Sequence, residues 1–322
     1  MRSSRTIRLI VTCTDRKTVR PPEHRMMRNL DAPVESRAAI WTDLLDIGPS
    51  DNSPALSAHD LYCGEHWTVV SSLVPEAVGR TLDLWVASAG LGLIHASAVV
   101  QSYGATFSAR VADSITRDVA ADERRSYCRS WWTILCRRSG SIADLARSDP
   151  KSPLIFAGSP AYVDPLASDL TEAAQELDDP ASLFVITSGG YSIPGSTTLR
   201  AVDRLASPDG LGGSLISLNA RLAKWLVESA TDHSFDPSKV HTRFEELIAS
   251  CPDRKRFDRQ RVDVDDVKQF IRSKFELAAQ DHRRPSSASA LLREFRDTGR
   301  ACEQKKFGAI YTEVACETGG TQ

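Results

Sequence analysis

Four short stretches of continuous apolar sequence constrain the fold of this chain most. Each is rich in apolar and β-branched residues and runs directly into small or turn-forming residues: 7–14 (IRLIVTCT), 82–89 (LDLWVASA), 154–159 (LIFAGS) and 183–188 (LFVITS). Continuous rather than alternating apolar character is typical of strands buried on both faces. Stretches with helical periodicity separate them, at 35–45, 122–138, 162–177 and 197–205. The pattern predicts an α/β fold with a mostly parallel, four-stranded sheet flanked by helices.

The loops that follow these strands are expected to meet at one end of the sheet, where open α/β folds bind ligands. A fifth loop, 210–217 (GLGGSLIS), opens a helix expected at 218–228. Glycine-rich turns before a helix leave backbone N–H groups for a phosphate, although tight turns alone explain them equally well. We expect DNA phosphates at four such positions, Gly189, Gly190, Gly213 and Ser214. The usual nucleotide-cofactor fingerprints do not follow any strand, so no cofactor is expected.

A change in composition divides the chain. We expect an α/β domain over 1–235, a linker or hairpin over 236–261, a small all-helical domain over 262–316 and a disordered tail over 317–322. Helices are expected at 264–279, 287–298 and 301–314, and the last two resemble a helix-turn-helix. Basic residues lie near their turn and are expected to contact DNA: Arg293, Arg296, Arg300, Lys305 and Lys306.

Charge and cysteine usage narrow the class of protein. The net charge is −2, yet residues 251–316 carry fifteen Lys and Arg against eleven Asp and Glu, which favours a polyanionic partner. The seven cysteines are scattered, and none forms a C-x-x-C pair, so we expect neither a metal site nor a disulfide framework. No apolar run is long enough to span a membrane. We expect a cytoplasmic protein with no obligate protein partner.

The loop after the first strand carries a carboxylate and two cations, Asp15, Arg16 and Lys17. At a strand end, Asp15 could orient a water molecule or stabilise a sugar cation, while Arg16 and Lys17 hold phosphate. The alternative is a solvated turn with local ion pairs.

A second cluster, LYCGEHW at 61–67, combines a phenol, a carboxylate, an imidazole and an indole. These groups suit a pocket for a nucleic-acid base, although tyrosine and tryptophan are also ordinary core residues. We expect Tyr62, Trp67, Ser88, Tyr103 and Phe107 to bind a base. Four residues are expected to be catalytic: Asp15, Glu65, His66 and Asn219. Asn219 could instead cap the helix at 218–228.

The absent motifs matter as well. Neither an H-E-x-x-H nor a P-C-x-x-C signature occurs, which argues against zincin and zinc-deaminase chemistry. Carboxylate, imidazole and backbone amides suffice to hydrolyse a glycosidic bond, in which a cation-like sugar is stabilised by negative charge.

The first 110 residues resemble a bacterial family of domains related to the YaaA peroxide-stress proteins. The resemblance rests on Cys13-x-x-x-Lys17, on Leu61-Tyr62-x-Gly64, on the segment from Trp85 to Leu93 and on Tyr103-x-x-Thr106-Phe107. The expected sheet is also similar to that of the uracil-DNA glycosylase superfamily, without its G-Q-D-P-Y-H motif. The whole arrangement resembles phage-defence DNA glycosylases that excise glucosylated hydroxymethylcytosine. This resemblance implies hydrolysis of the N-glycosidic bond of an extruded base.

Two other functions stay open at this point. The protein could be a non-catalytic regulator whose α/β domain senses a nucleotide while its helices bind DNA. It could also be a hydrolase or transferase of free deazapurine-like nucleosides, which would leave the basic helices unexplained.

Overall fold

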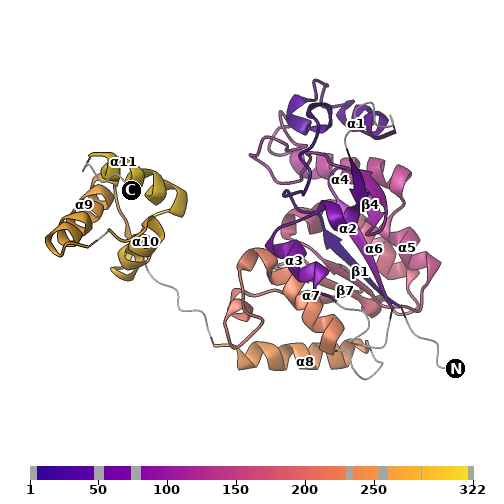
Figure 1. The fold of residues 1–322 in the computed structure, drawn as a ribbon. Helices are drawn as coiled ribbons and strands as arrows, with labels where there is room; N and C mark the ends of the chain where they lie inside the picture. Colours follow the sequence, from indigo (N-terminus) through magenta and orange to yellow (C-terminus); the bar gives the residue numbers. More distant parts are fainter. Residues whose placement is uncertain are drawn as a thin grey trace. The chain divides into compact units, whose positions relative to one another are not determined.

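The chain forms two compact units that divide after Asp253 (Figure 1). The computed structural model describes residues 6–46, 54–73, 81–229, 235–252, 260–283 and 285–317. The first unit is α/β and the second consists mainly of helices, as the sequence predicts. Within the described residues, no helix is both long and apolar enough to cross a membrane.

A six-stranded sheet forms the centre of the first unit, in the order β4-β3-β1-β6-β7-β8. All neighbours pair in parallel except β3 and β4, which form an antiparallel hairpin. The four predicted strands are confirmed as β1 (Ile7–Thr12), β3 (Leu82–Ser88), β6 (Leu154–Ala157) and β7 (Leu183–Thr187). Strands β1, β6 and β7 are buried along their whole length, which explains their unbroken apolar sequence.

Two strands of this sheet differ from the sequence prediction. β4 (Gly92–His95) extends the sheet beyond β3, and β8 (Thr197–Arg200) forms the opposite edge. The prediction of a helix at 197–205 is wrong, because this stretch contains β8 and most of a short 3-10 helix, η5 (Asp203–Ala206). Within β8 only Leu199 is buried, so this edge strand lacks the continuous apolar sequence of the inner ones. A separate two-stranded antiparallel sheet joins β2 (Ala55–Ser57) to β5 (Val99–Gln101).

Helices cover both faces of the sheet. α4 (Arg124–Ser139), α5 (Ile142–Ser148) and α6 (Pro160–Glu176) pack together on one face (Figure 1). α3 (Glu65–Ser71) and α7 (Leu218–Ser229) pack against each other on the other face, where α7 contacts β6 and β7. The helices α1 (Arg37–Asp46) and α2 (Ala58–Leu61) complete the N-terminal part.

The region 236–261 is not simply a linker or hairpin. Asp236 caps α8 (Pro237–Ser250) by accepting hydrogen bonds from the N–H groups of Ser238 and Lys239. Val240 and Phe244 on this helix belong to the core of the first unit. Only one face of α8 is apolar and buried, and the charged residues on its other faces make the segment resemble a linker in sequence.

The second unit contains three helices and a short parallel strand pair. Its helices are α9 (Val264–Gln280), α10 (Ala288–Asp297) and α11 (Gln304–Glu317), and β9 (Gln260–Arg261) pairs with β10 (Arg300–Ala301). Phe270, Phe295 and Phe307 form its aromatic core. The connection between α10 and α11 spans residues 298–303 and includes β10, so it is longer than the three- to four-residue turn of a helix-turn-helix. Glu317 still belongs to α11, and the rest of the expected tail lies outside the described residues.

Candidate functional site

The connectivity of the sheet creates a switch point between β1 and β6. From β1 the chain continues to β3 on one side, and it later returns to β6 on the other side of β1. The loops that follow β1 and β6 therefore run in opposite directions, and ligands of open α/β sheets bind at such a place. Gly158 lies in the second loop, where an added Cβ atom would come within 2.9 Å of the Thr12 methyl group. The two strand ends thus approach each other closely here.

Lys17 is the central cation of this site. Its ammonium group donates to the backbone oxygens of Thr14 and Asp15, at 3.3 and 3.2 Å. It also lies 4.5 Å from the centre of the Tyr103 ring and 5.9 Å from that of Tyr62. Burial lowers the pKa of Lys17, and the neighbouring Cys13 and Asp15 oppose that shift. The side chains of Asp15 and Arg16 in the same loop are exposed.

A chain of buried hydroxyl groups lies beneath Lys17. The Ser88 oxygen accepts hydrogen bonds from the N–H groups of Gly90 and Leu91, which uses both of its lone pairs. Its own proton is therefore donated to the Tyr103 hydroxyl, 2.6 Å away. Tyr103 in turn lies 2.9 Å from the Tyr62 hydroxyl, and burial raises the pKa of both phenols. These residues form a rigid, neutral floor for the site.

A thiol and two rings form the side of the site that borders β6. The Cys13 sulfur lies 3.0 Å from the Tyr162 hydroxyl, in the first turn of α6. The Tyr162 ring meets Phe107 edge to face, with ring centres 5.1 Å apart. Thus Phe107, Tyr62, Ser88 and Tyr103 do come together near Lys17, as the sequence predicts for a single site. The two tyrosines and Ser88 are buried, so these side chains support the site from below rather than offering open faces.

Glu65 binds a second loop rather than facing Lys17. Its carboxylate accepts hydrogen bonds from the Ser214 N–H at 3.2 Å, the Ser214 hydroxyl at 2.8 Å and the Ser217 hydroxyl at 2.8 Å. Arg221 adds an ion pair at 3.4 Å. These hydrogen bonds, those from Ser214 first, lower the pKa of Glu65 to about 2. A carboxylate held in this way is ionised and anchors a loop, so its chemistry differs from the general acid or base expected from the sequence.

The anchored loop presents two apolar side chains to solvent. They belong to a short 3-10 helix, η6 (Leu215–Ser217), where Leu215 is 51% exposed and Ile216 is 80% exposed. Ser214 and Ser217, on either side of them, are the residues that Glu65 binds. We call Leu215 and Ile216 the apolar tip.

The loop that carries the apolar tip is joined to the Lys17 loop through residues 63–65. Gly64 directly precedes Glu65, and a Cβ atom added to Gly64 would lie 3.4 Å from the Arg16 side chain. The backbone N–H of Cys63 donates to the Arg16 oxygen at 3.1 Å. Residues 63–65 therefore connect the strand-end loop to the tip over a few covalent and hydrogen bonds.

His66 and Asn219 each keep a buried atom without a hydrogen-bond partner in the described part of the chain, His66 Nε2 and Asn219 Oδ1. Burial lowers the pKa of His66, although its hydrogen bond to the Thr12 backbone opposes the shift. The neutral ring therefore donates to Thr12 through one nitrogen and leaves the other as an acceptor. This arrangement places His66 against the end of β1. Asn219 is the second residue of α7, the helix that directly follows the anchored loop.

Several expected site residues lie elsewhere. Trp67 is only 3% exposed, packs against Tyr62 and donates its indole N–H to the His59 oxygen, so it offers no free stacking face. Gly213 has a positive φ of 75° and packs under the Arg221 guanidinium. Gly189 and Gly190 follow β7, where Gly190 is exposed and Gly189 packs near Pro160.

The predicted DNA-contacting cations belong to the second unit. Arg293, Lys305 and Lys306 are exposed, whereas Arg300 stacks on the Phe270 and Phe295 rings, 5.1 and 4.6 Å from their centres. A hollow of about 540 Å³ in this unit has a positively charged lining. It is formed by Arg261, Val262, Arg296, Ala301, Cys302, Glu303 and Lys306.

Sequence reasoning gave no role to Cys13, Arg28, Asp113 or Tyr162. Arg28 binds Asp113 through Nε at 2.9 Å and through a second nitrogen, and Asp113 adds negative charge near Lys17. These partners are 85 residues apart, so no local pattern links them. Cys13 directly follows the observed strand β1, although the predicted stretch 7–14 includes it. Tyr162 lies in the first turn after the predicted strand at 154–159, and that placement was the available signal.

Metal chemistry gains no support from the described residues, among which no group of three or more His, Cys, Asp or Glu could hold an ion. No protein-family model, curated protein or solved structure matches this chain.

Proposed function

We propose that this protein is a DNA glycosylase that hydrolyses the N-glycosidic bond of a modified base and leaves an abasic site. One observation carries the proposal: residues 63–65 join the anchored loop of the apolar tip to a strand-end loop that bears an exposed carboxylate and two cations. An enzyme that acts on a base within a duplex must both extrude the nucleotide and stabilise charge at its sugar. The tip suits the first task and the loop suits the second.

Asp15 would act on the sugar. When the bond between base and C1′ breaks, positive charge develops on the sugar ring, and a nearby carboxylate stabilises it. The base leaves with the bonding electron pair and takes up a proton from solvent. A water molecule bonds to C1′ and releases its proton to Asp15, which returns it to solvent. Arg16 and Lys17 bind the phosphates on either side of the extruded nucleotide.

Leu215 and Ile216 would fill the gap that the base leaves in the helix. Apolar side chains that enter a base step replace part of the lost stacking, and proteins that deform DNA use Leu and Ile in this way. The wedge must be rigid to be effective. The hydrogen bonds of Glu65 to Ser214 and Ser217 supply that rigidity on both sides of the tip.

The second unit would add affinity for the DNA backbone. Its exposed cations Arg293, Lys305 and Lys306, with the positively charged hollow beside Arg296, provide phosphate contacts that carry no sequence information. Modified-base specificity then depends on the first unit. Glucosylated hydroxymethylcytosine, as found in modified phage DNA, is the first substrate to test.

The test incubates the full chain with duplexes that contain glucosylated hydroxymethylcytosine, hydroxymethylcytosine or cytosine, followed by hot alkali, which cleaves abasic sites. We expect cleavage of the modified strand alone. Asp15→Asn should reduce the rate at least a hundredfold while DNA binding persists, and Asp43→Asn, at an exposed position on α1, should not.

Ile216→Ser should reduce the cleavage of duplex more than that of single-stranded DNA, which needs no extrusion. Val99→Ser is its matched control, because Val99 is another exposed β-branched residue, at 72%. Unaltered DNA in every reaction would refute the glycosylase. DNA binding that survives Asp15→Asn, without cleavage by any form of the protein, would favour the non-catalytic regulator instead.

A further inference from the structure

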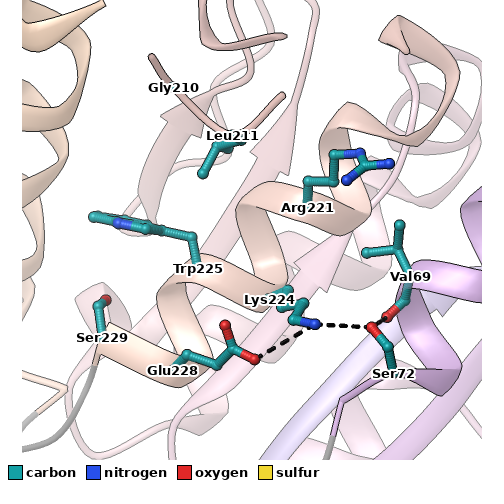
Figure 2. A pocket seen from close by; sticks show the side chains of 9 residues that line it. All are labelled: Val69, Ser72, Gly210, Leu211, Arg221, Lys224, Trp225, Glu228 and Ser229. Atoms are coloured by element: carbon teal, nitrogen blue, oxygen red, sulfur yellow. Dashed lines mark hydrogen bonds and ion pairs between the residues drawn. The ribbon is translucent and has the colours of Figure 1, made fainter. Parts of the chain in front are cut away.

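The first unit has a hollow of about 550 Å³ between α3 and α7 (Figure 2). Its volume falls in the range of about 300–1,000 Å³ that is usual for small-molecule sites. Val69 of α3 borders it, as do Ser72, which directly follows that helix, and Gly210 and Leu211. The residues that α7 contributes are Arg221, Lys224, Trp225, Glu228 and Ser229. The residues around Lys17 do not line this hollow, whereas Arg221 both lines it and pairs with Glu65.

One end of the hollow offers a flat aromatic surface. The half-buried Trp225 ring packs against Phe244 of α8, with ring centres 6.3 Å apart, which fixes its orientation. Figure 2 shows Trp225 and Arg221 rising from the same side of α7, with Leu211 between them. An indole beside a leucine is a surface on which a planar ring can stack.

The other end carries two cations with spare donors. The Lys224 ammonium lies 2.9 Å from the Ser72 hydroxyl and 3.6 Å from Glu228, as the dashed lines in Figure 2 show. Among the described residues, Arg221 uses Nε for Ser217 and Nη2 for Glu65, so its Nη1 donors stay free for a ligand. A phosphate bound here would meet a guanidinium, an ammonium and a hydroxyl.

A carboxylate stands between these two ends. Glu228 follows Lys224 by one helical turn and Trp225 by three residues, so its side chain is a neighbour of each of them on the surface of α7. A carboxylate between a ring surface and a phosphate site is well placed to accept hydrogen bonds from ribose hydroxyls, as acidic residues do in dinucleotide-binding folds.

We propose that the hollow between α3 and α7 binds a free ribonucleotide, with its base on Trp225, its ribose at Glu228 and its phosphate at Arg221 and Lys224. This site is independent of the glycosylase proposal, and each can fail without the other. Since Arg221 also belongs to the Glu65 anchor, a nucleotide at this site would bind one of the residues that hold the apolar tip.

Isothermal titration calorimetry on the full chain tests the proposal with AMP, ADP, ATP, GMP, GDP and GTP. Adenosine and guanosine lack the phosphate, and pyrophosphate lacks the ring. Because the hollow has sites for both, at least one nucleotide should bind tenfold or more tightly than its nucleoside or pyrophosphate. The 2′-deoxy form of that nucleotide should bind more weakly, and Glu228→Gln should reduce this difference.

Two variants locate the binding. Lys224→Gln and Trp225→Leu should each weaken nucleotide binding at least fivefold, whereas Lys224→Arg and Trp225→Phe should restore most of it. Lys151→Gln, at an exposed position before β6, is the matched control and should bind like wild type. Far-ultraviolet circular dichroism establishes that each variant is folded.

Three results would overturn the proposal: no binding of any nucleotide at millimolar concentration, equal binding by the Lys224→Gln and Trp225→Leu variants, or binding of single-stranded oligonucleotides without binding of mononucleotides. A chain that binds nucleotides but never cleaves DNA would refute the glycosylase and leave this site established. The reverse outcome would do the opposite.

Discussion

Ser88 allows the sharpest test of how the site is built. Its side chain is fully buried, and its oxygen accepts the N–H groups of Gly90 at 3.2 Å and Leu91 at 2.9 Å while it donates to Tyr103 at 2.6 Å. Ser88→Ala leaves two backbone donors and one phenol without this partner in a place that water does not reach. Each lost hydrogen bond costs about 1 kcal/mol, so the variant should lose about 2–4 kcal/mol of unfolding free energy.

Tryptophan fluorescence during urea denaturation is a suitable assay. All six tryptophans lie before residue 254, so the signal reports the first unit alone. Ser126→Ala, at an exposed position in α4, is the matched control and should stay within about 0.5 kcal/mol of wild type.

A double-mutant cycle isolates the bond between Ser88 and Tyr103. Tyr103→Phe alone should cost about 1–2 kcal/mol, and the double variant should cost about 1 kcal/mol less than the sum of the single changes. A loss below about 0.5 kcal/mol for Ser88→Ala would refute the reasoning, because it would mean that these buried donors find other partners. Additive losses would show that the two hydroxyls are not coupled.

Three further predictions concern other parts of the chain. Glu65→Gln should lower the unfolding free energy at pH 7 by about 1 kcal/mol, a figure discounted for screening because the Glu65 side chain is 46% exposed. The pKa of Glu65, about 2, lies below the ordinary 4.5, so the stability that Glu65 contributes is present above about pH 4.5 and is lost as the pH falls towards 2. In urea denaturation across this range, the unfolding free energies of the variant and wild type should converge at low pH. A constant difference between them would contradict the anchor. Gly90→Ala would place a Cβ atom 2.3 Å from the Tyr103 ring and should cost about 2–3 kcal/mol in the fluorescence assay; a loss near zero would contradict the tight packing of Gly90 against this ring. Phe295→Ala removes a fully buried ring of the second unit and should cost that unit about 3–5 kcal/mol of unfolding free energy. Circular dichroism should then show a transition at lower urea concentration, while the fluorescence transition stays unchanged. A shift in both signals would mean that the two units unfold together.

Local pattern identified the inner strands but failed at the sheet edge. Strands β1, β6 and β7 are buried on both faces, so each must be apolar at every position, and this requirement is visible in sequence. β8 and α8 each bury one face, so their sequences mix apolar with polar residues. The stretch 197–205 then looked helical, and 236–261 looked like a linker.

The same division applies to the candidate site. Parallel strands joined by crossovers must bring their following loops to one edge, and that rule alone indicated the neighbourhood of Lys17. It could not tell a buried support from an open face. Trp67, which has the chemistry to stack on a base, is a core residue.

The sequence by itself determined the α/β class, the inner strands and the loop that carries Asp15, Arg16 and Lys17, because burial on both faces and chain direction act over short stretches. Tertiary structure alone decided that Glu65 anchors Ser214 and Ser217, 149 and 152 residues away, and that Leu215 and Ile216 are exposed on this anchored loop. Which residues Glu65 meets depends on how α3 and α7 pack against each other. The sequence alone does not reveal whether a carboxylate contacts solvent, a substrate or two serine hydroxyls.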